Sequence, residues 1–398
     1  MMDQKRYDHL LTTYRDGLLQ DTVPFWVPRA IDKEFGGYTT LRLQNGDLLD
    51  TDKSIWFQGR FSWTLSTLYN QVEQNPEWLA AAKSGLDFLR KHGFDTDGRM
   101  FFHVEQDGTP IRKRRYFFSE CFMTVALAAY AHATSDAAVG QEAEALLKKI
   151  IHLIETPGAL EPKLFGNNRP SKALVVPMIL LNVAQEVRKA SGSSWVHELA
   201  EDCYKKIKND FMNHEHKAVL ESVAPDNGII DHIDGRMLNP GHSIEAAWFI
   251  FDEAVHRDHD QDMIQTGCTI IDWMWEWGWD TTHGGILYYR DVMNKPPQEY
   301  WHDMKFWWNH NEVIIATLYA YYLTADKKYL DMHTQVHDWA YAHFPDKEHG
   351  EWFGYLLRDG TISNTAKGTI YKGPFHLPRM QIKCWKLLEM IKQKGLIV

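Results

Sequence analysis

Asn239-Pro240-Gly241-His242-Ser243-Ile244-Glu245-Ala246 opens an apolar helix and marks one step of a repeat. Comparable helix openings recur about every sixty residues, and such a period is typical of a repeat architecture. One opening, Pro177-Met178, is apolar. The other five carry a polar or charged residue, namely Arg60, Glu120, His242, Glu312 and His376. In a closed repeat these five residues would meet in one pocket.

The segments after the openings are apolar on nearly all faces, and a helix of that kind is buried. They cover about residues 61–69, 121–130, 175–183, 246–254, 313–322 and 380–390. More amphipathic helices lie between them, at about residues 5–20, 77–92, 137–155, 193–211, 259–277 and 327–343. Six inner helices that alternate with six outer helices predict an all-α fold, an (α/α)6 barrel, with residues 1–398 as a single domain.

Four connections between an outer helix and the next inner helix contain short β-rich runs broken by Gly, Asn-Gly or Asp-Gly. They lie at 36–47, 97–108, 284–291 and 350–360. Such runs predict short β-hairpins. The hairpins should gather at the end of the barrel where the inner helices begin, which is therefore the predicted mouth of the pocket. Helix N-termini that point into this mouth favour negative charge there.

The composition excludes several classes of partner. A net charge of −10 argues against a nucleic-acid surface. No stretch approaches the roughly 20 apolar residues of a membrane span, and the first residues contain no apolar secretory region. The four cysteines, Cys121, Cys203, Cys268 and Cys384, are widely spaced without a C-x-x-C pair. They predict free thiols in a reducing compartment, and hence a cytoplasmic protein.

Aromatic residues are abundant, with 16 Trp, 17 Tyr and 19 Phe, and many lie at the helix openings. Sugars pack their C–H faces on aromatic rings, so an aromatic cavity with a few convergent polar groups is a plausible carbohydrate site. Trp56, Tyr116, Glu120 and Trp308 are the predicted substrate-binding residues. Simple core packing of large helix pairs would give the same composition.

His242 and His376 are predicted to be an acid/base pair, because each follows a glycine closely at a helix start. Glu245, one turn after His242, would fix the tautomer of that imidazole and raise its pKa. Arg60 would stabilise a developing oxyanion, with Glu312 facing the same cavity. These groups suit removal of a proton next to a carbonyl and its return from the opposite face, which inverts the carbon. Capping or core roles for the histidines remain the alternative.

A different role for Arg60 is a salt bridge to Glu120 or Glu312 at the base of the pocket. No metal site is predicted, because His214-Glu215-His216 is interpreted as an exposed turn. The phosphate loop, the dinucleotide-binding G-x-G-x-x-G and the G-x-S-x-G nucleophile elbow are absent from the sequence. The predicted chemistry requires neither a metal nor a redox cofactor.

These motifs resemble the N-acylglucosamine 2-epimerase family, which also includes cellobiose 2-epimerases and aldose–ketose isomerases of mannose-type sugars. The matching segments are Trp56-Phe57-Gln58-Gly59-Arg60, Asn239 to Ala246, Trp308 with Glu312, and Lys372 to Arg379. The resemblance implies an (α/α)6 barrel with His242 and His376 as the acid/base pair. It also implies that Arg60 and Glu312 assist at the substrate oxygens and that Glu245 supports His242.

Within the family, Ser171 to Asn182 is similar to the N-acylglucosamine epimerase branch. Cellobiose epimerases carry histidines in the corresponding helix, whereas Met178 to Arg188 contains none here. The resemblance therefore implies a small amino sugar as substrate, with interconversion of N-acetyl-D-glucosamine and N-acetyl-D-mannosamine. It further implies ATP as an allosteric activator that is not consumed, and a homodimer.

Three alternatives remain open from the sequence alone. The first is an aldose–ketose isomerase, or a 2-epimerase that acts on free mannose, glucose or a disaccharide. The second is a glycoside hydrolase, because (α/α)6 barrels often host hydrolysis by two carboxylates, although the histidine pair would then have no role. The third is a non-catalytic module that binds sugar or protein.

Overall fold

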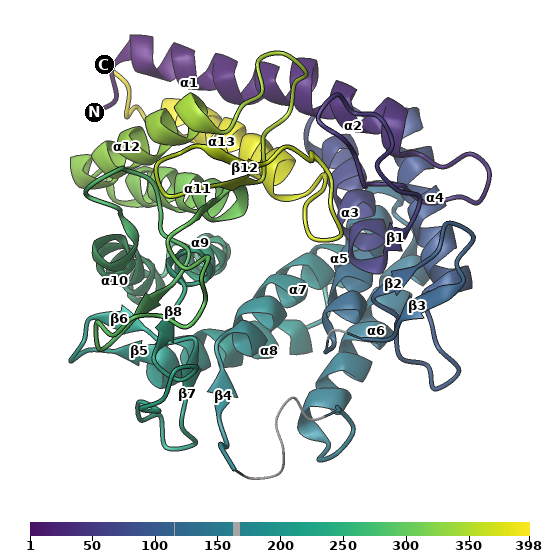
Figure 1. Cartoon of the computed structure of the whole chain (residues 1–398), viewed down its shortest axis with the longest axis horizontal. Coiled ribbons are helices and arrows are strands. Elements are labelled where there is room, and N and C mark those ends of the chain that lie inside the picture. The colour runs from purple at the N-terminus through teal and green to yellow at the C-terminus, as the bar shows by residue number, and fades with distance from the viewer. Residues whose placement is uncertain (115, 162–167) are drawn as a thin grey trace.

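The chain forms two concentric rings of helices (Figure 1) in this computed structural model, which describes residues 1–114, 116–161 and 168–398. The inner ring consists of α3 (Ile55–Gln71), α5 (Phe118–Thr134), α7 (Val175–Ser191), α9 (Pro240–His256), α11 (Trp307–Thr324) and α13 (His376–Gln393). Each of these helices contacts the next, and α13 contacts α3, so the ring closes. The predicted (α/α)6 barrel is confirmed.

The outer ring consists of α1 (Gln4–Asp16), α4 (Pro76–His92), α6 (Ala137–Glu155), α8 (Trp195–Lys206), α10 (Gln261–Gly278) and α12 (Lys327–His343). The predicted bounds agree with the structure except in the first helix. There the chain continues through a π-helical turn, Gly17–Thr22, into α2 (Val23–Ala30). A second π-helical turn, Ile207–Phe211, extends α8 to the predicted end.

The two rings begin differently, and the sequence explains why. Five outer helices, α1, α4, α6, α10 and α12, start at an Asp or Asn side chain that accepts a backbone N–H of the first turn. The inner helices α3, α5, α7, α11 and α13 have no such side-chain cap. Their first N–H groups therefore face the mouth of the barrel without a capping side chain.

Gly59 sets the approach of α3 to α5. A Cβ on Gly59 would lie 2.5 Å from the carbonyl oxygen of Phe122, which is inside van der Waals contact. Both helices are buried along nearly their whole length. The glycine therefore permits a backbone-to-backbone contact that fixes where the first turn of α3 stands in the ring.

Three connections at the mouth repeat one device. An aspartate two or three residues after α2, α10 or α12 uses one oxygen to accept N–H groups two and three residues later, and its other oxygen pairs with a buried lysine ammonium. The pairs are Asp32 with Lys53 (2.8 Å), Asp280 with Lys305 (3.0 Å) and Asp346 with Lys367 (3.1 Å). Because an uncompensated buried charge costs several kcal/mol, each pair holds its connection in one conformation.

The β structure at the mouth is shorter than the predicted hairpins. β1 (Lys53–Ser54), β2 (His103–Val104) and β3 (Pro110–Arg112) form one sheet, and β10 (Lys305–Phe306), β11 (Tyr355–Leu356) and β12 (Ile362–Asn364) form another. The remaining described strands form two-stranded pairs. These are β4 (Lys172–Ala173) with β7 (Ser222–Val223), β5 (Met212–Asn213) with β6 (Ala218–Val219), and β8 (Met237–Leu238) with β9 (Arg290–Asp291). His214-Glu215-His216 lies in the turn between β5 and β6, as predicted.

The two ends of the chain lie together. Met2 and Ile397 form a parallel bridge, and Tyr321 of α11 donates to the carbonyl of Leu396 at 3.0 Å. Figure 1 shows α1 running along α12 and α13 beside both termini. Among the described residues, no helix combines the length and hydropathy that a bilayer crossing requires.

Two buried histidines support the packing in their neutral form. The Nδ1–H of His310 donates to the carbonyl of Phe306 (2.7 Å), and its Nε2 accepts the N–H of Ile286 (2.9 Å). His333 makes the same kind of pair with the carbonyl of Ile314 (3.1 Å) and the hydroxyl of Tyr14 (3.1 Å). Burial lowers the pKa of His310 and of His333 to about 3.

These two histidines predict an acid-labile fold. Since the folded-state pKa lies below that of the unfolded chain, stability is present above about pH 6.5 and falls as the pH drops toward 3. At pH 5.5 each group removes roughly 1–1.5 kcal/mol from the free energy of unfolding. His242, whose pKa is raised, opposes part of this loss.

Urea unfolding at pH 7.5 and 5.5 measures the loss. We expect His310→Gln to lower stability at both pH values but to shrink the difference between them. His214→Gln, at an exposed turn, serves as the control and should keep the full difference. An equal free energy of unfolding at the two pH values for the unmodified protein would contradict the assignment.

Candidate active site

His242 lies in the first turn of α9, and local sequence fixes that turn. Pro240 stands at the start of the helix, and the Asn239 side chain caps it by accepting the N–H of His242 at 3.1 Å. A Cβ on Gly241 would lie 2.5 Å from Asn309 Nδ2 and 3.0 Å from Trp308 Cζ3. Only glycine therefore lets the start of α9 pack this closely on the start of α11.

The imidazole of His242 is held by Glu221, which lies directly before β7. Its Nδ1 is 3.0 Å from Glu221 Oε2, so Nδ1 carries the proton and Nε2 is left for other chemistry. The sequence predicted that Glu245 would hold this imidazole. That contact was predicted wrongly, because the carboxylate of Glu245 contacts Arg379 instead. Both residues lie one helix turn below the histidines, at the floor of the site.

His376 is the first residue of α13. Its Nδ1 is 2.7 Å from Glu312 Oε1, whereas Arg379 Nη2 is farther away at 3.3 Å. The shorter contact favours the tautomer in which Nδ1–H donates to Glu312. The preceding turn is anchored to α3, because Thr64 Oγ1 donates to the carbonyl of Pro374 at 2.9 Å.

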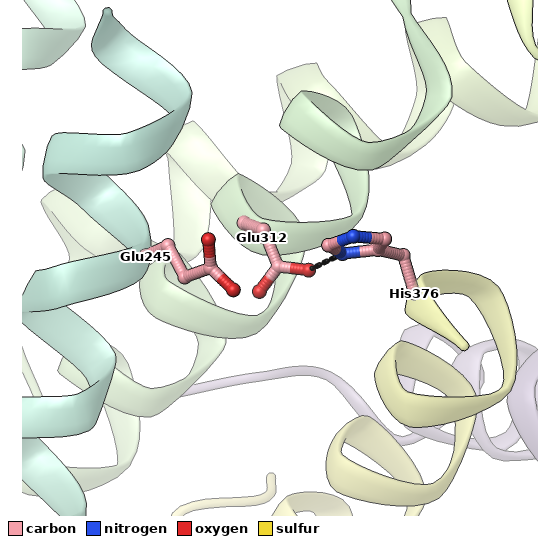
Figure 2. A group of neighbouring side chains, drawn as sticks. All are labelled: Glu245, Glu312 and His376. Atoms are coloured by element: carbon pink, nitrogen blue, oxygen red, sulfur yellow. Dashed lines mark hydrogen bonds and ion pairs between the residues drawn. The ribbon is translucent and has the colours of Figure 1, made fainter. Parts of the chain in front are cut away.

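Arg379 joins three inner helices beneath the histidines. Its Nη2 contacts Glu245 of α9 and lies 2.7 Å from Glu312 Oε1 of α11. Figure 2 shows Glu245 and Glu312 facing each other, with the dashed contact from Glu312 to His376. Ligand atoms of these three residues lie within 4.8 Å of one another, a spacing that suits a metal ion. The Arg379 guanidinium already supplies the positive charge that such an ion would bring.

Arg60 reaches the site from α3 among aromatic rings. Its guanidinium carbon lies 4.0 Å from the ring centroid of Phe122 and 4.9 Å from that of Phe375. Phe375 also lies 4.6 Å from the guanidinium carbon of Arg379, so one ring contacts both cations. Neither of the two salt bridges considered for Arg60 is found among the described residues, and its Nε has no hydrogen-bond partner there.

Trp308 lies between the two histidines. Its ring centroid is 5.0 Å from that of His242 and 5.8 Å from that of His376. The indole is buried, as is His376, whereas the His242 side chain is 30% exposed. The structure thus brings together His242, Trp308 and His376 at the starts of three successive inner helices, as predicted.

The other predicted substrate-binding residues have partners of their own. Trp56 packs on Phe102 (5.1 Å) and on Phe122 (5.5 Å). Tyr116 is half-buried, has a positive φ of 61° and packs on Phe117. Glu120 is buried in an ion pair with Arg99 (2.7 Å) and also accepts the N–H of Met100 (3.1 Å). Its carboxylate therefore holds the connection before α5.

The two histidines have opposite electrostatic surroundings. Burial lowers the pKa of His376, and the cations Arg379 and Arg60 lower it further, to well below its usual range. Burial also lowers the pKa of His242, but the carboxylate of Glu221, aided by Glu245 and Glu312, outweighs this and raises the pKa. Burial raises the pKa of Glu312 against the effect of Arg379. The surroundings thus favour a protonated His242 together with a neutral His376.

Sequence reasoning missed Glu221 and Arg379. Arg379 has a local signal, because it follows His376 by three residues and so lies on the same helix face. Glu221 has no such signal, since it lies in a connection 21 residues before His242. The pairing of β4 with β7 and the backbone contacts beside it bring Glu221 to the site.

Comparisons with known proteins find similar proteins over most of the chain. The family model described as N-acylglucosamine 2-epimerase (GlcNAc 2-epimerase) matches residues 36–373. The N-acylglucosamine 2-epimerase of Bos taurus is 35% identical over 380 residues, covering 93% of this chain and 89% of the relative.

Solved structures share the fold. Cellobiose 2-epimerase from Bacillus thermoamylovorans B4167 superimposes with a TM-score of 0.81 at 21% identity, covering 95% of this chain and 99% of that chain. A D-mannose isomerase gives a TM-score of 0.77 at 18% identity, covering 95% and 97%. At these identities the likeness concerns the fold alone.

The opposite surroundings of the histidines predict opposite titrations. On lowering the pH, His242 should gain its proton above its ordinary pKa near 6.5, whereas His376 should stay neutral throughout. Long-range ¹H–¹⁵N spectra of labelled protein distinguish the neutral from the charged ring. His242→Gln and His376→Gln assign the two sets of signals. Protonation of His376 before His242 would overturn the electrostatic argument.

Proposed function

Because the chain belongs to the N-acylglucosamine 2-epimerase family, we propose that it interconverts N-acetyl-D-glucosamine and N-acetyl-D-mannosamine by epimerisation at C2. It is a carbohydrate epimerase on the strength of its family. The observation that carries the chemistry is the pair of histidines at the starts of α9 and α13, with one indole between them and opposite charge preferences.

The proposed reaction acts on the open-chain sugar. One imidazole takes the proton from C2, and the C–H electron pair forms a C1–C2 double bond while the aldehyde oxygen gains the negative charge. The other imidazolium returns a proton to the opposite face of C2, and the carbonyl is restored. The sugar is neither oxidised nor reduced, so the step balances without a further reactant.

Each histidine is arranged for proton transfer through Nε2. Glu221 accepts Nδ1–H of His242, and Glu312 accepts Nδ1–H of His376, so the two Nε2 atoms are the reacting positions. Turnover needs one neutral and one charged ring, and the surroundings favour charge on His242. After each turnover the proton has changed rings, and exchange with solvent resets the pair.

The remaining predicted residues take supporting roles in this proposal. Arg60, held over aromatic rings, stabilises the oxyanion at C1. Burial and the nearby Arg379 lower the pKa of Arg60 to about 9, so it keeps its charge at neutral pH. The face of Trp308 supports the sugar between the histidines, with Trp56 and Tyr116 along the adjoining wall. Glu245 positions Arg379.

Proton exchange tests the reaction. In deuterated water, N-acetyl-D-mannosamine incubated with the protein should give N-acetyl-D-glucosamine with deuterium at C2 by proton NMR. No exchange, together with conversion of free mannose to fructose, would replace the proposal with aldose–ketose isomerisation. An N-acyl substrate cannot become a ketose in this way, because it has no hydroxyl at C2.

The histidine pair predicts the effect of single substitutions. His242→Ala and His376→Ala should each lower kcat by at least about 10²–10⁴-fold, the usual contribution of a general acid or base, while the circular dichroism spectrum is retained. His214→Ala, in the exposed β5–β6 turn, should keep full activity. Full activity in both single variants would exclude an acid/base role for the pair.

The bridge of Arg379 between Glu245 and Glu312 predicts that no divalent metal ion is needed. Incubation with a chelator followed by gel filtration should leave kcat unchanged. Loss of activity that returns on addition of one divalent ion would contradict this prediction.

Several properties implied by the family resemblance stay proposals. We propose that residues 1–398 act as one catalytic unit, which the bridge between Met2 and Ile397 supports. The four cysteines are buried and unpaired, which supports a reducing, cytoplasmic setting. A homodimer would appear in sedimentation equilibrium. ATP as an activator predicts the same increase in rate with ATP and with a non-hydrolysable analogue.

A further inference from the structure

The start of α7 is the one inner helix opening without a polar residue, and the strand pair beside it supplies one. β4 leads into α7 and pairs with β7, and the residue directly before β7 is Glu221. The backbone carbonyl of Glu221 accepts the N–H of Leu174, the residue that precedes α7, at 3.0 Å. The start of α7, where Pro177 and Met178 are apolar, therefore has a carboxylate beside it that comes from a different segment, Glu221.

The backbone around Glu221 is fixed on both sides. The N–H of Leu220 donates to the carbonyl of Phe211 at 3.0 Å, and the β4–β7 pair follows immediately. The Glu221 side chain is 13% exposed and contacts His242 Nδ1 at 3.0 Å. Its other oxygen, Oε1, is buried without a hydrogen-bond partner among the described residues. The carboxylate is thus committed to one contact from a rigid support.

The charges around His242 leave Glu221 unbalanced. In the floor, Glu245 of α9 and Glu312 of α11 contact Arg379 of α13. Arg60 of α3 supplies a second cation near both carboxylates. Two negative and two positive charges therefore cancel. His376 is neutral, and Tyr288 and Tyr289, which lie near Glu221, have pKa values raised by burial and by that carboxylate, so they carry no charge.

No lysine or arginine in the described part of the chain forms an ion pair with Glu221. Within the described residues, the negative charge of Glu221 is therefore balanced only when the His242 ring is protonated. Glu312 holds His376 by a contact of the same kind, but Arg379 contacts the same oxygen and offsets the negative charge of Glu312. The two histidines share a hydrogen-bond pattern and differ in net charge.

We propose that Glu221 is a positioning residue that favours the protonated ring of His242 and, once Nε2 has given up its proton, holds the neutral ring in the Nδ1–H tautomer, and so makes the two histidines unequal. This inference rests on the proposed epimerisation, in which one ring must start charged and the other neutral. Glu221 touches no reacting atom in the proposed reaction. It acts through the His242 ring, and the β4–β7 pair sets its place.

Glu221→Gln is the sharpest test, because the amide oxygen still accepts Nδ1–H while the charge is lost. We expect the pKa of His242, followed by ¹H–¹⁵N spectra, to fall by about one to three units. In the pH profile of kcat/KM, the alkaline limb should move to lower pH by a similar amount. At pH 8 the variant should be at least about tenfold slower, with the gap closing toward low pH.

Matched variants separate charge from structure. Glu221→Asp keeps the charge and should restore part of the alkaline limb, whereas Glu221→Ala loses both charge and acceptor and should be slower than Glu221→Gln. Glu215→Gln removes an exposed carboxylate from the β5–β6 turn and should leave the pKa of His242 and the pH profile unchanged. In every variant the equilibrium ratio of the two epimers must stay the same, since both directions slow by one factor.

The spectra and the kinetics distinguish a failure of this inference from a failure of the proposed function. An unchanged pKa of His242 in Glu221→Gln would overturn the role of Glu221, even if the protein is an active epimerase. A lowered pKa in a protein that does not exchange the C2 proton would uphold the contact and sink the proposed function. A uniform drop in kcat at all pH values, with the pKa unmoved, would show a purely structural role and also overturn the inference.

Discussion

The contact of Arg379 with Glu245 and Glu312 is the interaction on which the site depends. Three inner helices each bring a charge into a closed, apolar ring, and a buried charge without a partner costs several kcal/mol. One guanidinium satisfies both carboxylates, so α9, α11 and α13 are tied together directly beneath the histidines. The rings of Phe375 and Trp248 cover the same guanidinium at 4.6 and 5.1 Å. Arg60 supplies the second positive charge near these two carboxylates, so the floor is balanced in charge and fixed in place.

The connections at the mouth of the barrel are also held in fixed conformations. The buried pairs of Asp32 with Lys53, Asp280 with Lys305 and Asp346 with Lys367 recur at three mouth connections. In each, aspartate and lysine also bind backbone groups, so the charge pair orders a whole turn rather than two side chains. The starts of α3 and α11 therefore keep their positions relative to the ring.

Much of this arrangement could be predicted from the sequence, because helix periodicity and spacing are local signals. They placed the inner helices and brought His242, Glu312 and His376 together. They did not give the direction of each side chain, which depends on helix rotation: Glu120 binds Arg99 in the outer connection. Nor could they give the partner of His242, because Glu221 reaches it through strand pairing rather than helix spacing.

The asymmetry between the histidines has two sources, the repeated inner helices and the strand pair between β4 and β7. The sixfold repeat alone would place chemically similar rings at similar points, and two equal imidazoles would share protons evenly. Arg379 beside Glu312 removes negative charge from one ring, and Glu221 adds it to the other. One of these residues belongs to the repeat and the other comes from a strand pair outside it. A symmetric barrel thus supports an asymmetric proton transfer because a charge on one inner helix, Arg379, and a charge from one connection, Glu221, make the two rings unequal.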